Sequence, residues 1–228
     1  MQTYSQLLSL AVHEFRTPTS VVGGYLRMLQ RDADAPLSER QRKMIDEAAK
    51  SCGRIVELIN EMSDISKLDG GQAAVKLEAF DLFTVVQEVA DGMHKSQDRD
   101  VQLQVRGEGE GARTTGDLVR LRAAFTAFFK AILREQPASS TVVVERRFTT
   151  GDGRPHALVV VAAEQDVQMA YDAAPAPFDD RRGGLGLALP LARRVVERHG
   201  GRLWSPAVEG SATVRALVVS LPLPEINR

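Results

Sequence analysis

The most reactive arrangement of side chains in this sequence surrounds His13. Glu14 follows His13 directly, and Thr17 lies four residues further on, one turn along if the segment is helical. A neutral imidazole is a good nucleophile near neutral pH, and an adjacent carboxylate can accept the proton of its second ring nitrogen. The residues therefore predict a nucleophilic histidine. An exposed histidine beside a tolerated helix kink at Pro18 is an equally open interpretation.

The helices that must carry His13 are indicated by apolar residues that recur every three or four positions. The first series is Leu8, Ala11, Phe15, Pro18, Val22, Tyr25 and Leu29, and the second is Ile45, Ala48, Cys52, Ile55, Ile59 and Met62. A heptad numbering of the first series places His13 at the position farthest from the apolar seam. Ser38 and Gln41 form a capping-box pattern before the second series. Residues 1–69 are therefore predicted to form a hairpin of two helices.

A single helical hairpin with two continuous apolar seams leaves much of each seam in water. Pairing with a second copy would bury both seams, so the pattern predicts a homodimer built as a four-helix bundle. Packing of the hairpin against the C-terminal part of the chain is the alternative. The boundary between the two parts is expected near residues 69–75, where Gly70 and Gly71 end the helical pattern.

The segment from His13 to Pro18 reads HEFRTP and resembles the H-box of the sensor histidine kinases, whose usual form is HELRTP. Residues 24–26 (GYL) and 65–69 (ISKLD) are also similar to the phosphoacceptor hairpin of that family. The resemblance implies that His13 carries a phosphoryl group and exchanges it with an aspartate in the receiver domain of a response regulator. It also assigns Glu14 the orienting carboxylate and Thr17 a role in dephosphorylating the regulator.

Residues 75–228 mix helical patterns with β-rich runs and predict a second domain. Helices are expected over 80–93, 117–133 and 185–199, and strands over 101–105, 141–144, 157–161, 202–205 and 212–221. Helices combined with mostly antiparallel strands predict an α+β fold, in which an α/β sandwich follows the helical hairpin.

This second domain resembles the catalytic and ATP-binding domain of the histidine kinases. Residues 184–189 read GLGLAL, which is similar to the segment that follows the lid over ATP in that family, and residues 195–201 and 210–213 continue the resemblance. Glycines before a helix can offer backbone amides to phosphates. The resemblance therefore makes Gly184 and Gly186 candidate nucleotide-binding residues.

The residues that would hold magnesium in that family are missing from this sequence. Asp117 begins a pattern similar to the family's DxxRL motif, and it places the family's two asparagines at Ala127 and Ala131. Alanine offers no side-chain oxygen, whereas Mg²⁺ requires near-octahedral oxygen coordination. Glu135, one turn beyond Ala131, is the candidate substitute ligand.

The part of the family pattern that binds adenine is also altered. Glu164 falls where the family has an aspartate, and Asp166 and Gln168 fall at glycine positions, although Asp166 could be a shifted adenine ligand. The lid is short. Arg181 and Arg182 within it could reach phosphates, or they could belong to a solvated charged loop.

The composition excludes several other classes of protein. The chain has 29 basic and 30 acidic residues and a formal net charge of -1, which gives no electrostatic reason to expect nucleic acid or an anionic membrane as a partner. Its single cysteine forms no intramolecular disulfide and indicates a reducing compartment. The expectations are a cytoplasmic chain with no metal site, no bound nucleic acid and no direct membrane contact.

Three functions remain open for these residues. The first is a histidine phosphotransfer module of two-component signalling, with His13 as its only phosphorylated histidine and a degenerate second domain. The second is an active ATP-dependent sensor histidine kinase with atypical nucleotide contacts. The third is a non-catalytic pseudokinase that binds response regulators. No cofactor follows with certainty, and Mg-ATP stays open.

Overall fold

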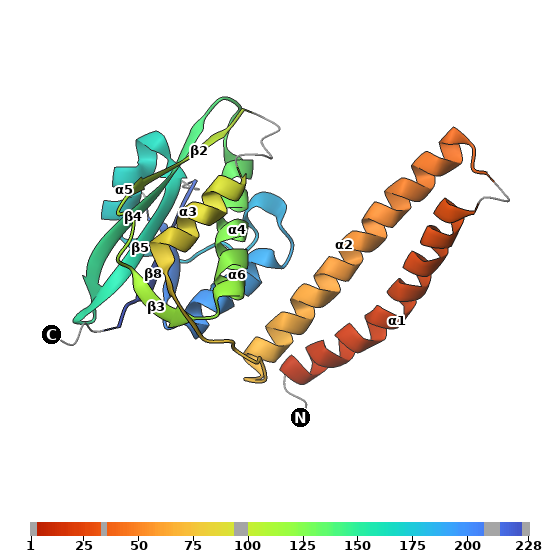
Figure 1. Ribbon diagram of the computed structural model, residues 1–228, viewed down its shortest axis with the longest axis horizontal. Helices are drawn as coiled ribbons and strands as arrows, with labels where there is room; N and C mark the ends of the chain where they lie inside the picture. Colours follow the sequence, from red (N-terminus) through yellow and green to blue (C-terminus); the bar gives the residue numbers. More distant parts are fainter. Residues whose placement is uncertain (1–3, 33–35, 94–99, 208–214, 225–228) are drawn as a thin grey trace. The chain divides into compact units, whose positions relative to one another are not determined.

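The computed structural model describes residues 4–32, 36–93, 100–207 and 215–224. Two compact units divide the chain, Met1–Ala73 and Ala74–Arg228. The first is a helical hairpin and the second is an α/β sandwich (Figure 1). Among the described residues, no helix combines the length and the apolar composition that crossing a membrane requires.

The hairpin consists of α1 (Tyr4–Arg31) and α2 (Glu39–Asp69). The predicted capping box at the start of α2 is confirmed, because the Ser38 hydroxyl accepts from the Gln41 amide while the Gln41 side chain accepts from the Ser38 amide. Helix α1 continues through Pro18 and curves along its length (Figure 1). A proline has no amide hydrogen, so the Glu14 carbonyl loses its intrahelical donor there.

The interior of the hairpin is formed by small and branched side chains. Val12 and Gly23 of α1 are buried, as are Cys52, Ile59 and Ile65 of α2. Gly23 permits a close approach of the helices, since a Cβ at that position would lie 3.3 Å from the Cys52 sulfur. The interior therefore lies on a face of α1 that is rotated from the predicted seam.

Most of the predicted seam of α1 faces outward in the single chain. Phe15 is 54% exposed and Tyr25 is 63% exposed, and Val22 and Leu29 are exposed as well. Ile55 of the α2 seam is 48% exposed, whereas Ile59 is buried within the hairpin. The outward apolar side chains thus form a surface that its own partner helix does not cover.

The second unit contains one main sheet and several helices. Its strands are β1 (Glu78–Asp81), β2 (Gln102–Gly107), β3 (Arg113–Gly116), β4 (Thr141–Gly151), β5 (Arg154–Ala163), β6 (Pro175–Ala176), β7 (Arg202–Pro206) and β8 (Ala216–Pro222). Its α-helices are α3 (Leu82–Met93), α4 (Leu118–Glu135), α5 (Val167–Asp172) and α6 (Ala188–Arg198). The described residues of this unit also include the 3₁₀ turns η2 (Glu164–Asp166) and η3 (Arg182–Gly184).

The main sheet has the strand order β2-β4-β5-β8-β7-β6. Strands β2 and β4 are parallel, and the other neighbouring strands are antiparallel. Strands β1 and β3 form a separate antiparallel pair. The predicted α+β class is therefore confirmed, and β4 and β5 form an antiparallel hairpin.

Helices cover both faces of this sheet (Figure 1). Leu158, Val160 and Ala162 of β5 pack in one cluster with Val167 and Ala170, at the start and middle of α5. The alternate residues of β5 point to the opposite face, where α3, α4 and α6 lie. The aromatic core on α4 includes a T-shaped pair, with the Phe125 and Phe128 ring centroids 5.9 Å apart.

Several predicted boundaries shift in the structure. The helix expected from residue 80 begins at Leu82, because Asp81 ends β1 and accepts hydrogen bonds from the Phe83 and Thr84 amides. The structure also contains α5 (Val167–Asp172), which is not among the predicted helices. Residues 210–213, which carried part of the family resemblance, lie outside the described residues, and so does His94.

Candidate phosphoacceptor site

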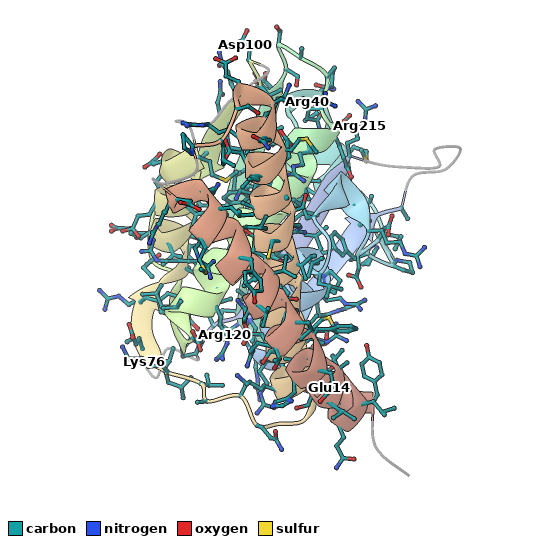
Figure 2. The ribbon with its side chains drawn as sticks, turned by 90° about the vertical axis from the view of Figure 1, so that its right-hand side faces the viewer. Glu14, Arg40, Lys76, Asp100, Arg120 and Arg215 are labelled. Carbon is teal, nitrogen blue, oxygen red and sulfur yellow. The ribbon has the colours of Figure 1, made fainter. Side chains whose placement is uncertain are left out.

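His13 stands in solvent on the outer side of α1. Its side chain is 79% exposed, and the neighbouring Glu14 side chain is 70% exposed. Figure 2 shows Glu14 near the amino-terminal end of α1. The predicted outward position of His13 is confirmed, and the buried residues of α1 are Val12 and Gly23.

The Glu14 carboxylate is placed to orient the imidazole. His13 Nδ1 and Glu14 Oε1 are 3.4 Å apart, a long hydrogen bond in which Nδ1–H donates when the ring is neutral. That tautomer leaves the Nε2 lone pair directed toward solvent. Thr17, the third predicted site residue, is exposed one turn further along α1.

The described histidines of the second unit form hydrogen bonds within that unit. His199 Nδ1–H donates to the Val195 carbonyl at 2.7 Å, and its Nε2 accepts from the Asp117 amide at 2.9 Å. His156 Nδ1 lies 2.8 Å from the Ser220 hydroxyl. Both ring nitrogens of His199 are therefore occupied, which sets it apart from His13.

The position matched to the family's metal-binding asparagine is covered by the chain itself. Ala131 is completely buried on α4, and Ala127 is 7% exposed. A Cβ added to Gly183 would lie 2.8 Å from the Ala131 Cα and 3.1 Å from its carbonyl oxygen. The backbone of the short lid therefore rests directly on α4 at Ala131.

Glu135 and Arg182 are paired with each other. Arg182 Nε donates to Glu135 Oε1 at 3.1 Å, and Arg182 Nη2 donates to Glu135 Oε2 at 2.5 Å. Arg182 does not belong to a solvated loop, because its side chain is 3% exposed and its guanidinium is engaged by Glu135. Glu135, the candidate substitute metal ligand, has its carboxylate engaged by this guanidinium.

The residues aligned with the family's adenine-binding motif form contacts with other side chains of this chain. Glu164 is paired with Arg106 of β2, and it begins the turn η2 that also contains Asp166. Gln168 lies in α5 and bonds Asp172 at 2.7 Å. Glu164 and Asp166 are thus near each other in the chain, but Glu164 faces Arg106, a basic side chain that no sequence pattern indicates.

Gly184 and Gly186 take the backbone conformation that glycine permits. Their φ angles are 59° and 66°, in the left-handed region. The carbonyls of Gly183 and Gly184 accept from Arg134 Nη1 at 3.1 and 3.4 Å. Sequence reasoning missed Arg134, since no local pattern indicates that it holds a segment 49 residues away.

Taken together, these residues do not fit Mg-ATP. The expected metal ligand is an alanine under the lid backbone, its substitute Glu135 is held by Arg182, and Glu164 is held by Arg106. Among the described residues, no group of three or more His, Cys, Asp or Glu side chains could hold a metal ion.

Comparisons with known proteins place the hairpin in a defined class. Residues 3–71 match the His Kinase A (phospho-acceptor) domain. The chain is 25% identical to the sensor protein GacS of Pseudomonas syringae over 236 residues, covering 97% of this chain and 25% of GacS. It is 30% identical to the sensor protein DivL of Caulobacter vibrioides over 197 residues, covering 83% of this chain and 24% of DivL. The chain therefore spans about a quarter of each of these relatives.

Solved structures show the same fold. Full-length ShkA, determined in complex with AMPPNP, superposes with a TM-score of 0.67 at 20% identity, covering 97% of this chain and 46% of ShkA. The histidine kinase ThkA, in complex with the response regulator protein TrrA, gives a TM-score of 0.55 at 16% identity, covering 97% of this chain and 62% of ThkA.

Hairpin and sandwich together define a phosphoacceptor domain followed by a domain with the fold of the histidine kinase ATPases. The chain is related to the sensor histidine kinases of two-component signalling.

Proposed function

We propose that this chain is a histidine phosphotransfer module, in which His13 exchanges a phosphoryl group with an aspartate of a response regulator receiver domain. The exposed His13 imidazole beside the Glu14 carboxylate is the observation that carries this proposal. The His Kinase A match over residues 3–71 supports it. The ThkA structure contains a response regulator as partner, which supports the same class of partner here.

The chemistry requires one nitrogen as nucleophile and one as proton carrier. The Nε2 lone pair of His13 attacks the phosphorus of an aspartyl phosphate, and the N–P bond forms as the P–O bond to the aspartate breaks. The aspartate leaves as a carboxylate. The positive charge on the ring is balanced by Glu14, which accepts the hydrogen bond, or the proton, from Nδ1. The reverse sequence passes the group to a second aspartate.

Dephosphorylation of the regulator is the second reaction that the hairpin surface could support. Thr17 is exposed on the same face of α1 as His13, one turn away. Its hydroxyl can accept a hydrogen bond from water and donate one. We assign it the positioning of a water molecule at the aspartyl phosphate of a docked receiver domain.

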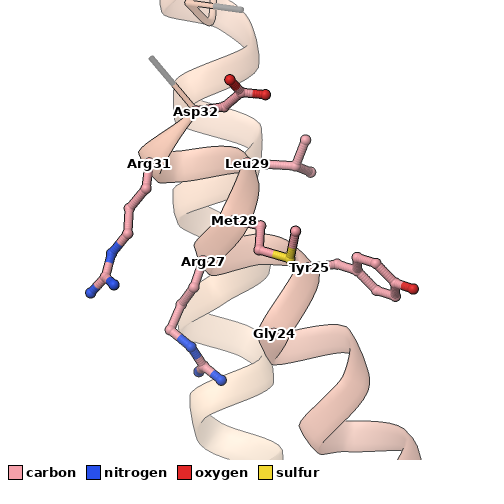
Figure 3. Close-up of a pocket in the computed structure, with 7 residues that line it drawn as sticks. All are labelled: Gly24, Tyr25, Arg27, Met28, Leu29, Arg31 and Asp32. Atoms are coloured by element: carbon pink, nitrogen blue, oxygen red, sulfur yellow. The ribbon is translucent and has the colours of Figure 1, made fainter. Parts of the chain in front are cut away.

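The hairpin is proposed to act as a homodimer. Figure 3 shows Tyr25 and Leu29 on one side of α1 and Arg27 and Arg31 on the other. The apolar side continues through Phe15 and Val22, which are exposed in the single chain. A second copy would cover this surface and complete a four-helix bundle. The lone cysteine, Cys52, fits a cytoplasmic location for that dimer.

The proposal is tested by incubation with a receiver domain that acetyl phosphate has phosphorylated. The full chain should become labelled, and the label should be labile in acid and stable in base, as expected for phosphohistidine. The His13→Ala variant should lose the label, while the control His156→Gln, which changes a histidine of the second unit, should retain it.

Two other outcomes decide against the phosphotransfer module. Binding of the receiver domain without any labelling would favour the non-catalytic pseudokinase. Labelling from Mg-ATP alone, with no receiver domain present, would favour the ATP-dependent kinase.

A further inference from the structure

The buried guanidinium of Arg182 links three parts of the second unit. It forms the two-pronged ion pair with Glu135 at the end of α4. Its Nη1 also donates to the Ala216 carbonyl of β8 at 2.6 Å and lies 3.4 Å from the Ser205 hydroxyl of β7. An arginine this deeply buried requires such partners, because desolvation of an unpaired charge costs far more than the fold can offset.

The backbone next to Arg182 is fitted to α4. Gly183 has a φ of 61° and approaches Ala131 so closely that a Cβ at position 183 would lie 2.8 Å from the Ala131 Cα, so a side chain there would displace the segment. Arg134 holds the Gly183 carbonyl from the next turn of α4. The small side chain of Ala131 therefore leaves the space that the backbone of the lid segment fills.

These contacts lie where the resemblance to histidine kinases would place the metal and phosphates of a nucleotide. Ala131 matches the metal-binding position, and the segment from Arg182 to Gly184 is the remnant of the lid. A side-chain cation occupies this place, and a carboxylate of the same chain neutralises it. Any phosphate group entering here would have to displace the Arg182–Glu135 pair.

We propose that Arg182 is an internal plug, which together with Glu135 and the Ala216 carbonyl holds the lid remnant closed and keeps the second unit shut to nucleotide. This inference does not depend on the phosphotransfer proposed for His13. According to this proposal, the second unit stays closed, and its surface is the same in the presence and absence of ATP.

Trypsin provides a direct readout of the plug, because it cleaves after arginine only when that side chain can enter its specificity pocket. The Arg181→Ala variant serves as the parent, since it removes the adjacent exposed arginine. The measured quantity is the rate of cleavage of the Arg182–Gly183 bond in the full chain, followed by mass spectrometry. When opening is fast, this rate reports the population of the open state.

In the parent, the bond should resist cleavage. Glu135→Gln removes the charge that holds the guanidinium and should speed cleavage at least about tenfold, which corresponds to about 1.4 kcal/mol. Arg134→Ala, which releases the Gly183 carbonyl and changes an exposed side chain, should speed it as well. The control Glu88→Gln removes a surface ion pair with Arg122 elsewhere on α4 and should leave the rate unchanged.

Three results would overturn the plug. The first is cleavage of the parent at the rate of the unfolded chain, and the second is an unchanged rate in both Glu135→Gln and Arg134→Ala. The third is slower cleavage of the parent when Mg-ATP is added, because this would mean that nucleotide enters the site. Circular dichroism shows whether a variant has unfolded. If Glu135→Gln has unfolded, the cleavage rate of Arg134→Ala tests the proposal instead.

Discussion

The pairing of His13 with Glu14 is a short-range consequence of their adjacency, and it brings a carboxylate oxygen 3.4 Å from one ring nitrogen. In the tautomer that donates from Nδ1 to Glu14, Nε2 carries the lone pair. Phosphoryl transfer from an aspartyl phosphate then depends on how firmly Glu14 holds that tautomer.

Glu14→Gln should slow phosphoryl transfer to His13 about 100-fold, the lower end of the usual range for a positioned general base. The amide keeps the size of the carboxylate and loses its charge, so the helix is unaffected. Rapid-quench labelling from a phosphorylated receiver domain measures the rate. Glu47→Gln, an exposed carboxylate on α2, is the control, and equal rates for both variants would remove Glu14 from the mechanism.

Thr17→Ala should separate the two reactions of the hairpin. Labelling of His13 should stay within about twofold of the unchanged chain, while loss of phosphate from the receiver aspartate should slow about tenfold, the effect of one lost hydrogen bond of about 1.4 kcal/mol. Release of inorganic phosphate gives the second rate. Ser20→Ala changes a neighbouring exposed hydroxyl of α1 and should alter neither rate, and a similar loss in both variants would show that the role of Thr17 is not specific.

The helices of the hairpin owe their boundaries to local chemistry. Ser38 and Gln41 satisfy each other's backbone amides at the start of α2, and Gly70 follows its last residue. These features act within one turn, so they hold whether or not a second copy is bound.

Ser38→Ala should lower the free energy of unfolding of the hairpin by about 1 kcal/mol, the typical cost of removing an N-cap side chain. Chemical denaturation followed by helical circular dichroism measures the change. Ser51→Ala is the matched control, because Ser51 only bonds the Glu47 carbonyl within α2 and its loss should not destabilise the helix. A larger loss from Ser51→Ala than from Ser38→Ala would contradict the importance of the cap.

Ile55→Asp is the cleanest test of the proposed dimer. Ile55 is 48% exposed in the single hairpin, so aspartate there is tolerated by the monomer but would be buried without a partner in a dimer. Light scattering should report about 24.9 kDa for the variant and about twice that for the unchanged chain.

Ile59→Asp is unsuited to this test, because Ile59 is 4% exposed within the hairpin and the substitution would unfold it. Lys50→Asp places the same charge on an exposed polar position of α2 and should leave the dimer intact. A monomer at every concentration for the unchanged chain would disprove the four-helix bundle.

Over the whole chain, the proposed phosphoacceptor residues of the hairpin are open to solvent, while the corresponding part of the second unit is proposed to be closed. His13 is exposed, whereas Ala131 and Arg182 are buried. A phosphoryl group is therefore expected to reach His13 from a protein partner rather than from ATP bound to the second unit.

Mg-ATP at millimolar concentration should not raise the thermal unfolding midpoint of the full chain. A ligand present at 100 times its dissociation constant would stabilise the folded state by about 2.7 kcal/mol, which is easily measured. Ala131→Asn should not create binding, and it should lower the midpoint because the larger side chain meets the Gly183 backbone. A midpoint raised by Mg-ATP in either protein would restore the ATP-dependent kinase as the better function.

The sequence by itself determined the features that depend on near neighbours. The exposed position of His13 and the α+β class follow from helical and strand periodicity, and the adjacency of Glu14 and the cap at Ser38 follow from the order of neighbouring residues. Each requires only residues within a turn or a strand of one another. The resemblance of residues 13–18 to the H-box added the chemistry.

Only the tertiary structure decided which contacts form between distant segments. Arg182 and Glu135 are 47 residues apart, and Arg106 and Glu164 are 58 apart, so no local pattern could pair them. The same holds for the seam of α1, whose apolar residues are divided between the hairpin interior and the outer surface by a rotation that the close contact of Gly23 with Cys52 allows. Periodicity permits several arrangements of these elements. Packing selects the one in which the buried charges are paired and the small residues lie where another backbone segment approaches closely.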